Sequence, residues 1–396
     1  MEKILLPGLL RGSVRLPFSK SELHRALICA ALSPGETAVC APAPCEDVRA
    51  TAAGLAALGA DVQYRDEKYY VNQIDPARSA VLDCGESGTS LRFLLPLAAA
   101  LGVEAEFRCR GRLAERPMSP LLAVLNANGC TVNREGQSFR LSGGLQPGDY
   151  LLDASASSQF LSGLLLALPL LQGSSIQLCG AVASEDYVNL TAAVMQRFGV
   201  TASRREDRCR VAGTYRSPGD YAPEGDWSAA AFWLCANAMG SEISPEGLSA
   251  ESLQPDRAVT ALISAVRAGG AVISAARTPD LLLPLAVLAA VTPGETRFTE
   301  AARLRQKESD RLAALSAMLK ALGGDCTETA DGLCIRGVPS LRGGTVDSFG
   351  DHRIAMAAAI AAAVCTDPLT LRGAEAVEKS YPAFWSDFAR LGGKSE

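Results

Sequence analysis

Six apolar segments of helical length recur along the chain, and each follows a short polar motif. Leu161 to Leu171, Leu281 to Ala290 and Ile354 to Val364 have no polar face, which is typical of helices buried on all sides. A turn and a short β-rich strand come next: S-P-G-E-T-A-V at Ser33 to Val39 is answered by T-P-G-E-T-R-F at Thr292 to Phe298. Most units then add a second helix that ends at glycine. The pattern predicts an α/β protein built from one recurring unit.

The second helices define the period of this repeat. They end at glycines that are spaced by 70, 70, 70, 54 and 69 residues, namely Gly59, Gly129, Gly199, Gly269, Gly323 and Gly392. A period that steady indicates a structural repeat. Six copies predict two domains of three repeats each. We place one domain at residues 18–225 and the other, discontinuous, at residues 1–17 plus 226–396.

The polar motifs stand where the buried helices begin. If the helices of a domain run alike, their N-termini meet at one end and present free N–H groups and positive dipole ends to a common space. Such a space favours phosphates and carboxylates. The motifs are Ser19-Lys20-Ser21, Gly85 to Thr89, Ser155 to Gln159, Gly225 to Ser228, Thr278-Pro279-Asp280 and Gly350 to Arg353.

One charged run stands out from the apolar background. Leu304 to Arg311 reads L-R-Q-K-E-S-D-R, and apolar residues follow it at helical spacing. This predicts a loop and the first turn of an amphipathic helix, with Lys307 and Arg311 on one face. Taken alone, the run fits a solvated helix start with exposed ion pairs.

Several motif residues have a purely structural alternative. Ser19 fits an ordinary helix N-cap, and Asp280 fits the cap of the apolar helix that follows it. Asp351 likewise fits a cap followed by an exposed Arg353. Asp280 and Glu308 could instead serve as base and acid, if both face one desolvated cleft.

Composition removes several classes of function. The chain has 396 residues and a net charge of -5, which argues against nucleic-acid binding. Only two histidines are present, so a His-rich metal site is not expected. The 12 cysteines form no C-x-x-C pair and are expected to be reduced core residues, among them Cys179, in a cytoplasmic protein. The N-terminus does not resemble a signal peptide, and no apolar run is long enough to span a membrane.

Taken together, the motifs resemble those of the enolpyruvyl transferase family, and within it the branch that acts on shikimate 3-phosphate. The resemblance covers essentially the whole chain and depends on six motifs in order. They are S-K-S-x-x-x-R at Ser19 to Arg25, G-x-x-G-T-x-x-R at Gly85 to Arg92, E-R-P at Glu115 to Pro117, S-S-Q-F at Ser157 to Phe160, K-E-S-D-R at Lys307 to Arg311 and D-H-R-x-A-M at Asp351 to Met356.

This resemblance implies a fold and a reaction. The fold is a two-domain inside-out α/β barrel, in which each domain has three βαβαββ-type repeats with helices buried under sheets and the active site lies in the cleft between the domains. The reaction transfers the enolpyruvyl group of phosphoenolpyruvate to the 5-hydroxyl of shikimate 3-phosphate and releases phosphate. The resemblance implies no metal or organic cofactor, and these two small molecules as partners of a monomer.

The resemblance also assigns site residues. Asp280 is the implied base, and Glu308, with Lys20, the implied proton donor. The residues implied around shikimate 3-phosphate are Lys20, Ser21, Arg25, Ser157, Ser158, Ser184, Asp280 and Lys307. Those implied around phosphoenolpyruvate are Lys20, Gly88, Arg116, Gln159, Arg311, Arg353 and Lys379. One departure is Glu86, where the family commonly has Asn; its carboxylate could pair with Arg92.

Three alternatives remain at this level. A relative that uses UDP-N-acetylglucosamine usually has a reactive cysteine five residues before the Arg-Pro pair, where this chain has Gly111, and Cys109 lies two residues off. A non-catalytic anion-binding paralogue would keep the arginines and could lose Asp280 and Glu308, which are both present. An RNA-modifying relative would be expected to have a basic face.

Overall fold

The computed structural model describes residues 1–396, and these divide into two compact units. Unit 1 consists of Met1–Pro17 and Glu224–Glu396, and unit 2 of Phe18–Pro223. The passage expected at residue 226 lies at Glu224 in this division. The N-terminal strands belong to unit 1, because β1 (Glu2–Leu6) pairs with strands from the end of the chain and β2 (Arg11–Arg15) pairs with β15 (Glu242–Glu246).

Unit 2 contains three repeats. The first helix of each is α1 (Lys20–Ala31), α3 (Gly88–Leu101) or α5 (Ser158–Ala167), and the second is α2 (Glu46–Ala57), α4 (Ser119–Ala127) or α6 (Asp186–Arg197). Two 3-10 segments are η1 (Leu113–Glu115) and η2 (Leu168–Leu170). The strands are β3 (Thr37–Cys40), β4 (Val62–Arg65), β5 (Lys68–Val71), β6 (Ser79–Asp83), β7 (Glu104–Arg108), β8 (Cys130–Glu135), β9 (Ser138–Gly143), β10 (Asp149–Leu152), β11 (Ser175–Leu178), β12 (Val200–Arg205), β13 (Arg208–Gly213) and β14 (Asp220–Tyr221).

Unit 1 has the same plan. Its first helices are α7 (Trp227–Ala238), α9 (Leu282–Ala290) and α11 (His352–Ala362), and its second helices are α8 (Val259–Arg267), α10 (Arg311–Ala321) and α12 (Phe384–Arg390). The 3-10 segments are η3 (Pro255–Ala258), η4 (Pro279–Leu281), η5 (Ala302–Gln306) and η6 (Ala374–Lys379). The remaining strands are β16 (Val272–Ser274), β17 (Glu295–Thr299), β18 (Asp325–Glu328), β19 (Leu333–Arg336), β20 (Gly344–Asp347), β21 (Leu369–Arg372) and β22 (Lys394–Ser395).

The sheets repeat one topology. In the order β6-β7-β9-β8, the strands on either side of α3 pair in parallel and a hairpin completes the sheet antiparallel. The sheets β10-β11-β13-β12 and β16-β17-β19-β18 have the same order. The repeat spacing of 54 residues has a simple cause, since no hairpin intervenes between α8 and β16. In each unit one further sheet joins strands from the two ends of that unit's sequence. In unit 2, β14 pairs with β3, and in unit 1, β1 pairs with β21.

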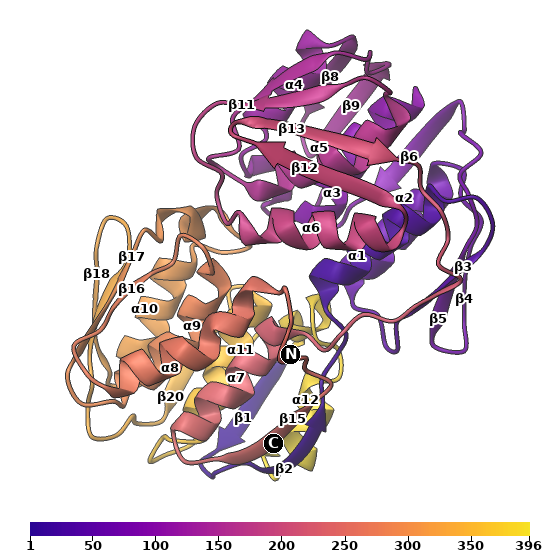
Figure 1. Ribbon diagram of the computed structural model, residues 1–396. Coiled ribbons are helices and arrows are strands. Elements are labelled where there is room, and N and C mark those ends of the chain that lie inside the picture. The colour runs from indigo at the N-terminus through magenta and orange to yellow at the C-terminus, as the bar shows by residue number, and fades with distance from the viewer. The chain divides into compact units, whose positions relative to one another are not determined.

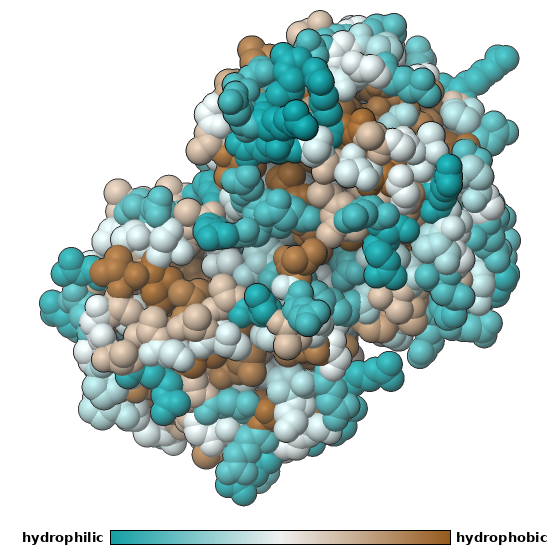
Figure 2. All heavy atoms as spheres, viewed as in Figure 1, coloured by the Kyte–Doolittle hydropathy of each residue, from teal (hydrophilic) through white to brown (hydrophobic).

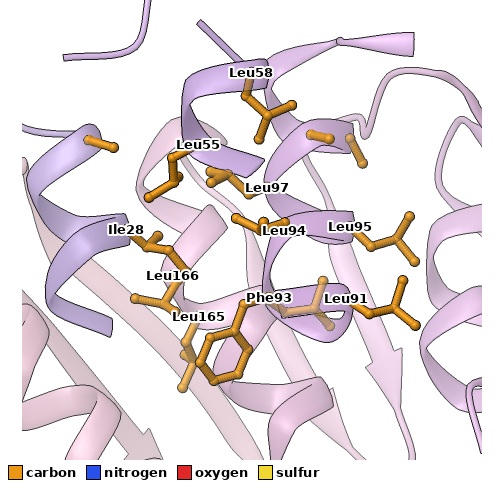
Figure 3. Close-up of a cluster of buried hydrophobic side chains, with 14 of the residues drawn as sticks. Ile28, Leu55, Leu58, Leu91, Phe93, Leu94, Leu95, Leu97, Leu165 and Leu166 are labelled. Carbon is orange, nitrogen blue, oxygen red and sulfur yellow. The ribbon is translucent and has the colours of Figure 1, made fainter. Parts of the chain in front are cut away.

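The first helices are buried, as the missing polar face predicts. Every residue of α9 and of α11 is buried. In unit 2 the core is made by side chains from α1, α2, α3 and α5, among them Ile28, Leu55, Leu94 and Leu166 (Figure 3). The first helices are thus enclosed within each unit, whereas the second helices α6 and α8 lie toward the viewer in Figure 1 with no sheet in front of them. The fold is therefore a two-domain inside-out α/β fold.

The glycines that end the second helices adopt positive φ. Gly59 has φ 112°, Gly129 98° and Gly199 83°, a region that only glycine occupies at low cost. Gly269, Gly323 and Gly392 behave alike. The regular spacing of these glycines therefore reflects the same positive-φ residue at the end of the second helix in all six repeats.

Two local predictions were wrong. Lys307 does not share a helical face with Arg311, because α10 begins at Arg311 with Asp310 as its N-cap and Lys307 lies in the loop before it. Cys179 is exposed rather than in the core, since it follows the last residue of β11; the other 11 cysteines are buried or half-buried, and all 12 are free.

The outer faces of the sheets meet solvent. Figure 2 shows hydrophilic residues over much of the visible face, with apolar residues between them. Val81 and Leu151 are exposed, and Val272 is too, each on the edge strand of its sheet. None of the helices combines the length and the apolarity that a membrane crossing requires.

Gly163 allows α5 to approach α3 closely, and this predicts a measurable cost of enlarging it. A methyl group at Gly163 would collide with the carbonyl oxygen of Arg92 and meet Pro96 Cγ at 3.1 Å. Alanine normally favours a helix over glycine by about 1 kcal/mol, but overpacking costs about 1–3 kcal/mol. We expect Gly163→Ala to lower the free energy of unfolding, measured by urea denaturation. Gly148→Ala is the control, since its nearest neighbour is 4.0 Å away; equal stability of both variants would contradict this packing.

Candidate active site

The buried helices of unit 2 begin with capping side chains. Ser19 accepts a hydrogen bond from Glu22 N, Ser87 from Ser90 N and Ser157 from Gln159 N. The cap of α3 is thus Ser87. These caps satisfy one N–H group each and leave the rest of the first turn for other acceptors.

The start of α1 is tied to the start of α3 by a buried polar chain. His24 Nδ1 lies 2.6 Å from Thr51 Oγ1 on α2, which lies 2.7 Å from Ser90 Oγ on α3. Ser90 Oγ donates in turn to Ser87 Oγ at 2.7 Å. All four side chains are fully buried. Burial lowers the pKa of His24 to about 3, so the imidazole is neutral in the folded protein.

Lys20 lies at the N-terminus of α1 and pairs with a carboxylate that sequence reasoning missed. Its Nζ lies 2.8 Å from Asp47 Oδ2, and the side chains are 19% and 7% exposed. Because the helix dipole disfavours a cation there, Asp47 offsets part of the cost of holding it. Lys20 keeps the greater share of exposure, as an anion-binding group requires.

Arg25 is 2% exposed and binds protein atoms on all three nitrogens. Nε donates to Thr191 Oγ1 at 2.7 Å, and the two terminal nitrogens donate to Ser21 O and Tyr187 O. Burial lowers the pKa of Arg25 to about 10, and the side chain stays charged at neutral pH. Arg25 therefore ties α1 to α6.

Gly88 lies beside two arginines. A methyl group at Gly88 would stand 3.0 Å from a terminal nitrogen of Arg116 and 3.1 Å from one of Arg92. Arg92 donates to Gln159 Oε1 at 2.8 Å, and Gln159 Nε2 donates to Thr89 Oγ1 at 2.8 Å. The starts of α3 and α5 thus bring Gly88, Arg116 and Gln159 together, in a place where a larger residue than glycine would press on the two arginine side chains.

The remaining predicted residues of unit 2 lie in nearby turns. Ser158 is buried in the first turn of α5 beside its cap Ser157. Ser184 adopts φ 48° and is 7% exposed, just before α6; positive φ is uncommon for serine and is frequent at functional sites. Glu86, for which pairing with Arg92 was one possibility, is exposed, and its carboxylate lies against Gly111. Arg92 is 4% exposed.

In unit 1 a buried arginine gathers three carboxylates. Arg311 is 2% exposed and binds Asp351 through Nε at 2.7 Å, Asp280 through one terminal nitrogen at 2.7 Å and Glu308 through the other at 2.9 Å. Asp351 also caps α11 by accepting from Arg353 N at 2.9 Å. The solvated-run alternative fails, because the charged run ends in this buried cluster.

Asp280 is not a helix cap. It lies in η4, and its two oxygens bind Arg311 at 2.7 Å and Arg353 at 2.9 Å. Arg353, expected to be exposed if it followed a simple cap, is 6% exposed. Burial raises the pKa of Asp280, but the positive charges of Arg353, Lys307 and Arg311 outweigh burial and hold this pKa well below its ordinary value.

A second buried carboxylate, Asp256, interacts with Asp280 through its charge. Asp256 in η3 is 1% exposed and accepts a hydrogen bond from Ser228 Oγ in the first turn of α7. Burial, and then the charge of Asp280, raise the pKa of Asp256 to about 6, although Arg353 opposes the shift. The charges at the starts of α9 and α11 therefore act on Asp256, which also binds the first turn of α7. Lys379 is buried in η6, which packs against α11.

Sequence reasoning missed the residues that support the site. Asp47, Thr51, Thr191 and Asp256 carry no recognisable motif of their own. Thr51 and Thr191 are separated by two periods of 70 residues. Each is hydrogen-bonded to a side chain of α1, Thr51 to His24 and Thr191 to Arg25. The period was therefore the one available signal for these two threonines.

Solved enolpyruvyl transferases share this fold. The chain is similar to EPSP synthase from Acinetobacter baumannii with a TM-score of 0.81 and 24% identity, over 100% of this chain and 99% of that one. It is similar to the enolpyruvyl transferase NikO from Streptomyces tendae with a TM-score of 0.77 and 18% identity, over 100% and 98%. The two-unit α/β architecture is thus the fold of these two solved proteins.

The sequence narrows this class further. The family model of EPSP synthase (3-phosphoshikimate 1-carboxyvinyltransferase) matches residues 6–388. A relative of that name from Clostridium kluyveri is 40% identical over 412 residues, covering 98% of this chain and 96% of its own length, and one from Clostridium perfringens is 38% identical over 420 residues, covering 99% of each. The chain belongs to the EPSP synthase family.

The low pKa of buried His24 predicts how the stability of the protein depends on pH. This pKa is about 3 in the folded protein and about 6.5 in an unfolded chain, so only the unfolded state binds this proton between those values. Stability from His24 is complete above about pH 6.5 and falls as the pH falls, by up to about 1.4 kcal/mol per pH unit. In His24→Asn, urea unfolding between pH 6.5 and 4.5 should lose that part of the slope. An unchanged slope would contradict a neutral buried imidazole.

Proposed function

We propose that this chain transfers the enolpyruvyl group of phosphoenolpyruvate to the 5-hydroxyl of shikimate 3-phosphate and releases phosphate, with no metal or organic cofactor. The family match over residues 6–388 supports this activity. The structural observation that supports this reaction most is that the carboxylates of Asp280 and Glu308 both bind buried Arg311. A proton acceptor and a proton donor are what an addition to an enol requires.

Unit 2 supplies groups suited to anions. We assign Lys20 to both substrates and Gly88, Arg116 and Gln159 to phosphoenolpyruvate. The start of α1, the serines of α5 and the turn before α6 we assign to shikimate 3-phosphate, through Ser21, Arg25, Ser157, Ser158 and Ser184. Hydroxyl and backbone N–H donors at helix starts suit a phosphate. Arg25, which donates a hydrogen bond to a protein acceptor from each of its three nitrogens, would hold Ser21 and Tyr187 in place.

Unit 1 supplies the reacting groups. We assign Asp280 as the base that takes the proton of the 5-hydroxyl, and Lys307 as its neighbour at shikimate 3-phosphate. Arg311, Arg353 and Lys379 are assigned to phosphoenolpyruvate. Glu308, with Lys20, is assigned to protonate the enol methylene, which makes the phosphate-bearing carbon cationic. Positive groups arranged in advance stabilise charge that develops in such a step.

The alternative acceptor is UDP-N-acetylglucosamine. The position five residues before Arg116 is Gly111, and the nearby Cys109 is 6% exposed. Burial raises the pKa of its thiol to about 12, so Cys109 is a poor nucleophile.

We propose that the protein is a monomer in the cytoplasm. Its 12 free cysteines agree with this location, because thiols stay reduced there.

Phosphate release tests the activity directly. With phosphoenolpyruvate present, we expect release with shikimate 3-phosphate and none with UDP-N-acetylglucosamine. Asp280→Asn should lower kcat by about 10²–10⁴-fold, the usual contribution of general acid–base catalysis, while calorimetry still detects shikimate 3-phosphate binding. Glu328→Gln, which removes a carboxylate paired with Arg305, is the control and should keep full activity. No release with either acceptor would refute the proposed function.

A further inference from the structure

Asp280 is held the way a substrate carboxylate would be held. Its Oδ1 takes a hydrogen bond from Arg311 at 2.7 Å, and its Oδ2 takes one from Arg353 at 2.9 Å. One carboxylate thus joins two guanidinium groups from α10 and α11. These are two of the three arginines assigned to phosphoenolpyruvate, whose own carboxylate has the same shape and charge.

Of the three carboxylates on Arg311, Asp280 is the one best placed to leave. Its side chain is 18% exposed, compared with 10% for Glu308 and 0% for Asp351. Asp351 anchors Arg311 from the buried side through two nitrogens, at 2.7 and 3.2 Å. Arg311 would therefore stay in place while the partner on its more exposed edge changes.

We propose that Asp280 occupies, on Arg311 and Arg353, the place that the carboxylate of phosphoenolpyruvate takes, so that binding of phosphoenolpyruvate releases Asp280 to act as the base. This inference rests on the proposed function and adds to it a coupling: the second substrate activates the residue that deprotonates the first. The exchange replaces one carboxylate by another at both arginines, and the net charge around them is conserved.

The exchange changes how well Asp280 accepts a proton. The groups that face it are Arg311 of α10, Arg353 of α11, Lys307 and Glu308 of the loop before α10, Asp256 of η3 and Arg303 of η5. Burial raises the pKa of Asp280, and the positive charges of Arg353, Lys307 and Arg311 lower it further than burial raises it. Once a ligand carboxylate neutralises Arg311 and Arg353, the lowering weakens and burial and Glu308 act in the opposite direction. The proton of the 5-hydroxyl can then pass to an oxygen of Asp280 as that hydroxyl oxygen bonds to the enol carbon.

The test follows the side-chain carboxyl carbon of Asp280 by ¹³C NMR, with the resonance assigned through Asp280→Asn. Without ligand it should not titrate between pH 5 and 8. Saturating phosphoenolpyruvate alone, which has no acceptor to react with, should shift the resonance and move the pKa of Asp280 upward, because the two arginines are then neutralised by the ligand. Pyruvate should shift the resonance in the same direction, and inorganic phosphate should not. A shift with phosphate but not with pyruvate would overturn the exchange.

A matched pair of arginine variants provides a second readout. Arg353→Gln removes one of the two pairs and should raise the pKa of Asp280 before any ligand is added. Arg305→Gln removes an arginine that binds Asp310 and Glu328 instead, and should leave the Asp280 resonance unchanged. If Arg353→Gln does not fold, the ligand titration of the natural protein still decides the matter.

Failure of this inference differs from failure of the proposed function. If the enzyme releases phosphate with shikimate 3-phosphate, yet saturating phosphoenolpyruvate leaves the Asp280 resonance unmoved, the exchange is wrong and the activity stands. If no phosphate is released with either acceptor, the proposed function fails, whatever the resonance does.

Discussion

The constraint on which this structure depends is the burial of its first helices on all sides. A helix such as α9 or α11, buried along its whole length, has no flank on which to carry polar chemistry. Its free N–H groups and positive dipole end can face an anion only at its first turn. Each repeat therefore places its polar motif at the start of its first helix, and side-chain contacts bring the starts together: His24, Thr51 and Ser90 join α1 to α3, and Arg92 and Gln159 join α3 to α5.

Charge in unit 1 is organised around Arg311. Removing a guanidinium and three carboxylates from water costs free energy. The buried cluster is tolerated because each charged group has a partner at hydrogen-bond distance. Such a cluster adds little to stability compared with apolar packing. Its value lies in positioning, since Asp351 fixes Arg311 and Arg311 in turn orients Asp280 and Glu308. The proposed base and the proposed acid thus share one buried cation.

The sequence supports the fold and the site to different depths. The 70-residue period and the apolar first helices predicted six repeats, because burial and glycine caps leave a signal in composition. The motifs pointed to Lys20, Asp280 and Arg311. They could not show that Lys20 pairs with Asp47 or that Asp256 lies near Asp280, since such contacts join residues far apart in the chain and depend on tertiary packing. The start of α10 was misplaced because Lys307 and Arg311 also fit helical spacing.

A crystal structure with shikimate 3-phosphate and a non-reacting analogue of phosphoenolpyruvate would show whether anions bind at the starts of the buried helices and whether one of them replaces Asp280. The distances to measure are those from Asp280 to Arg353 and to Arg311, now 2.9 and 2.7 Å. The account predicts that both exceed hydrogen-bond range, with the ligand carboxylate on the two arginines and Asp280 turned to the 5-hydroxyl. Asp280 still paired with both arginines, and the ligand bound away from the helix starts, would contradict it.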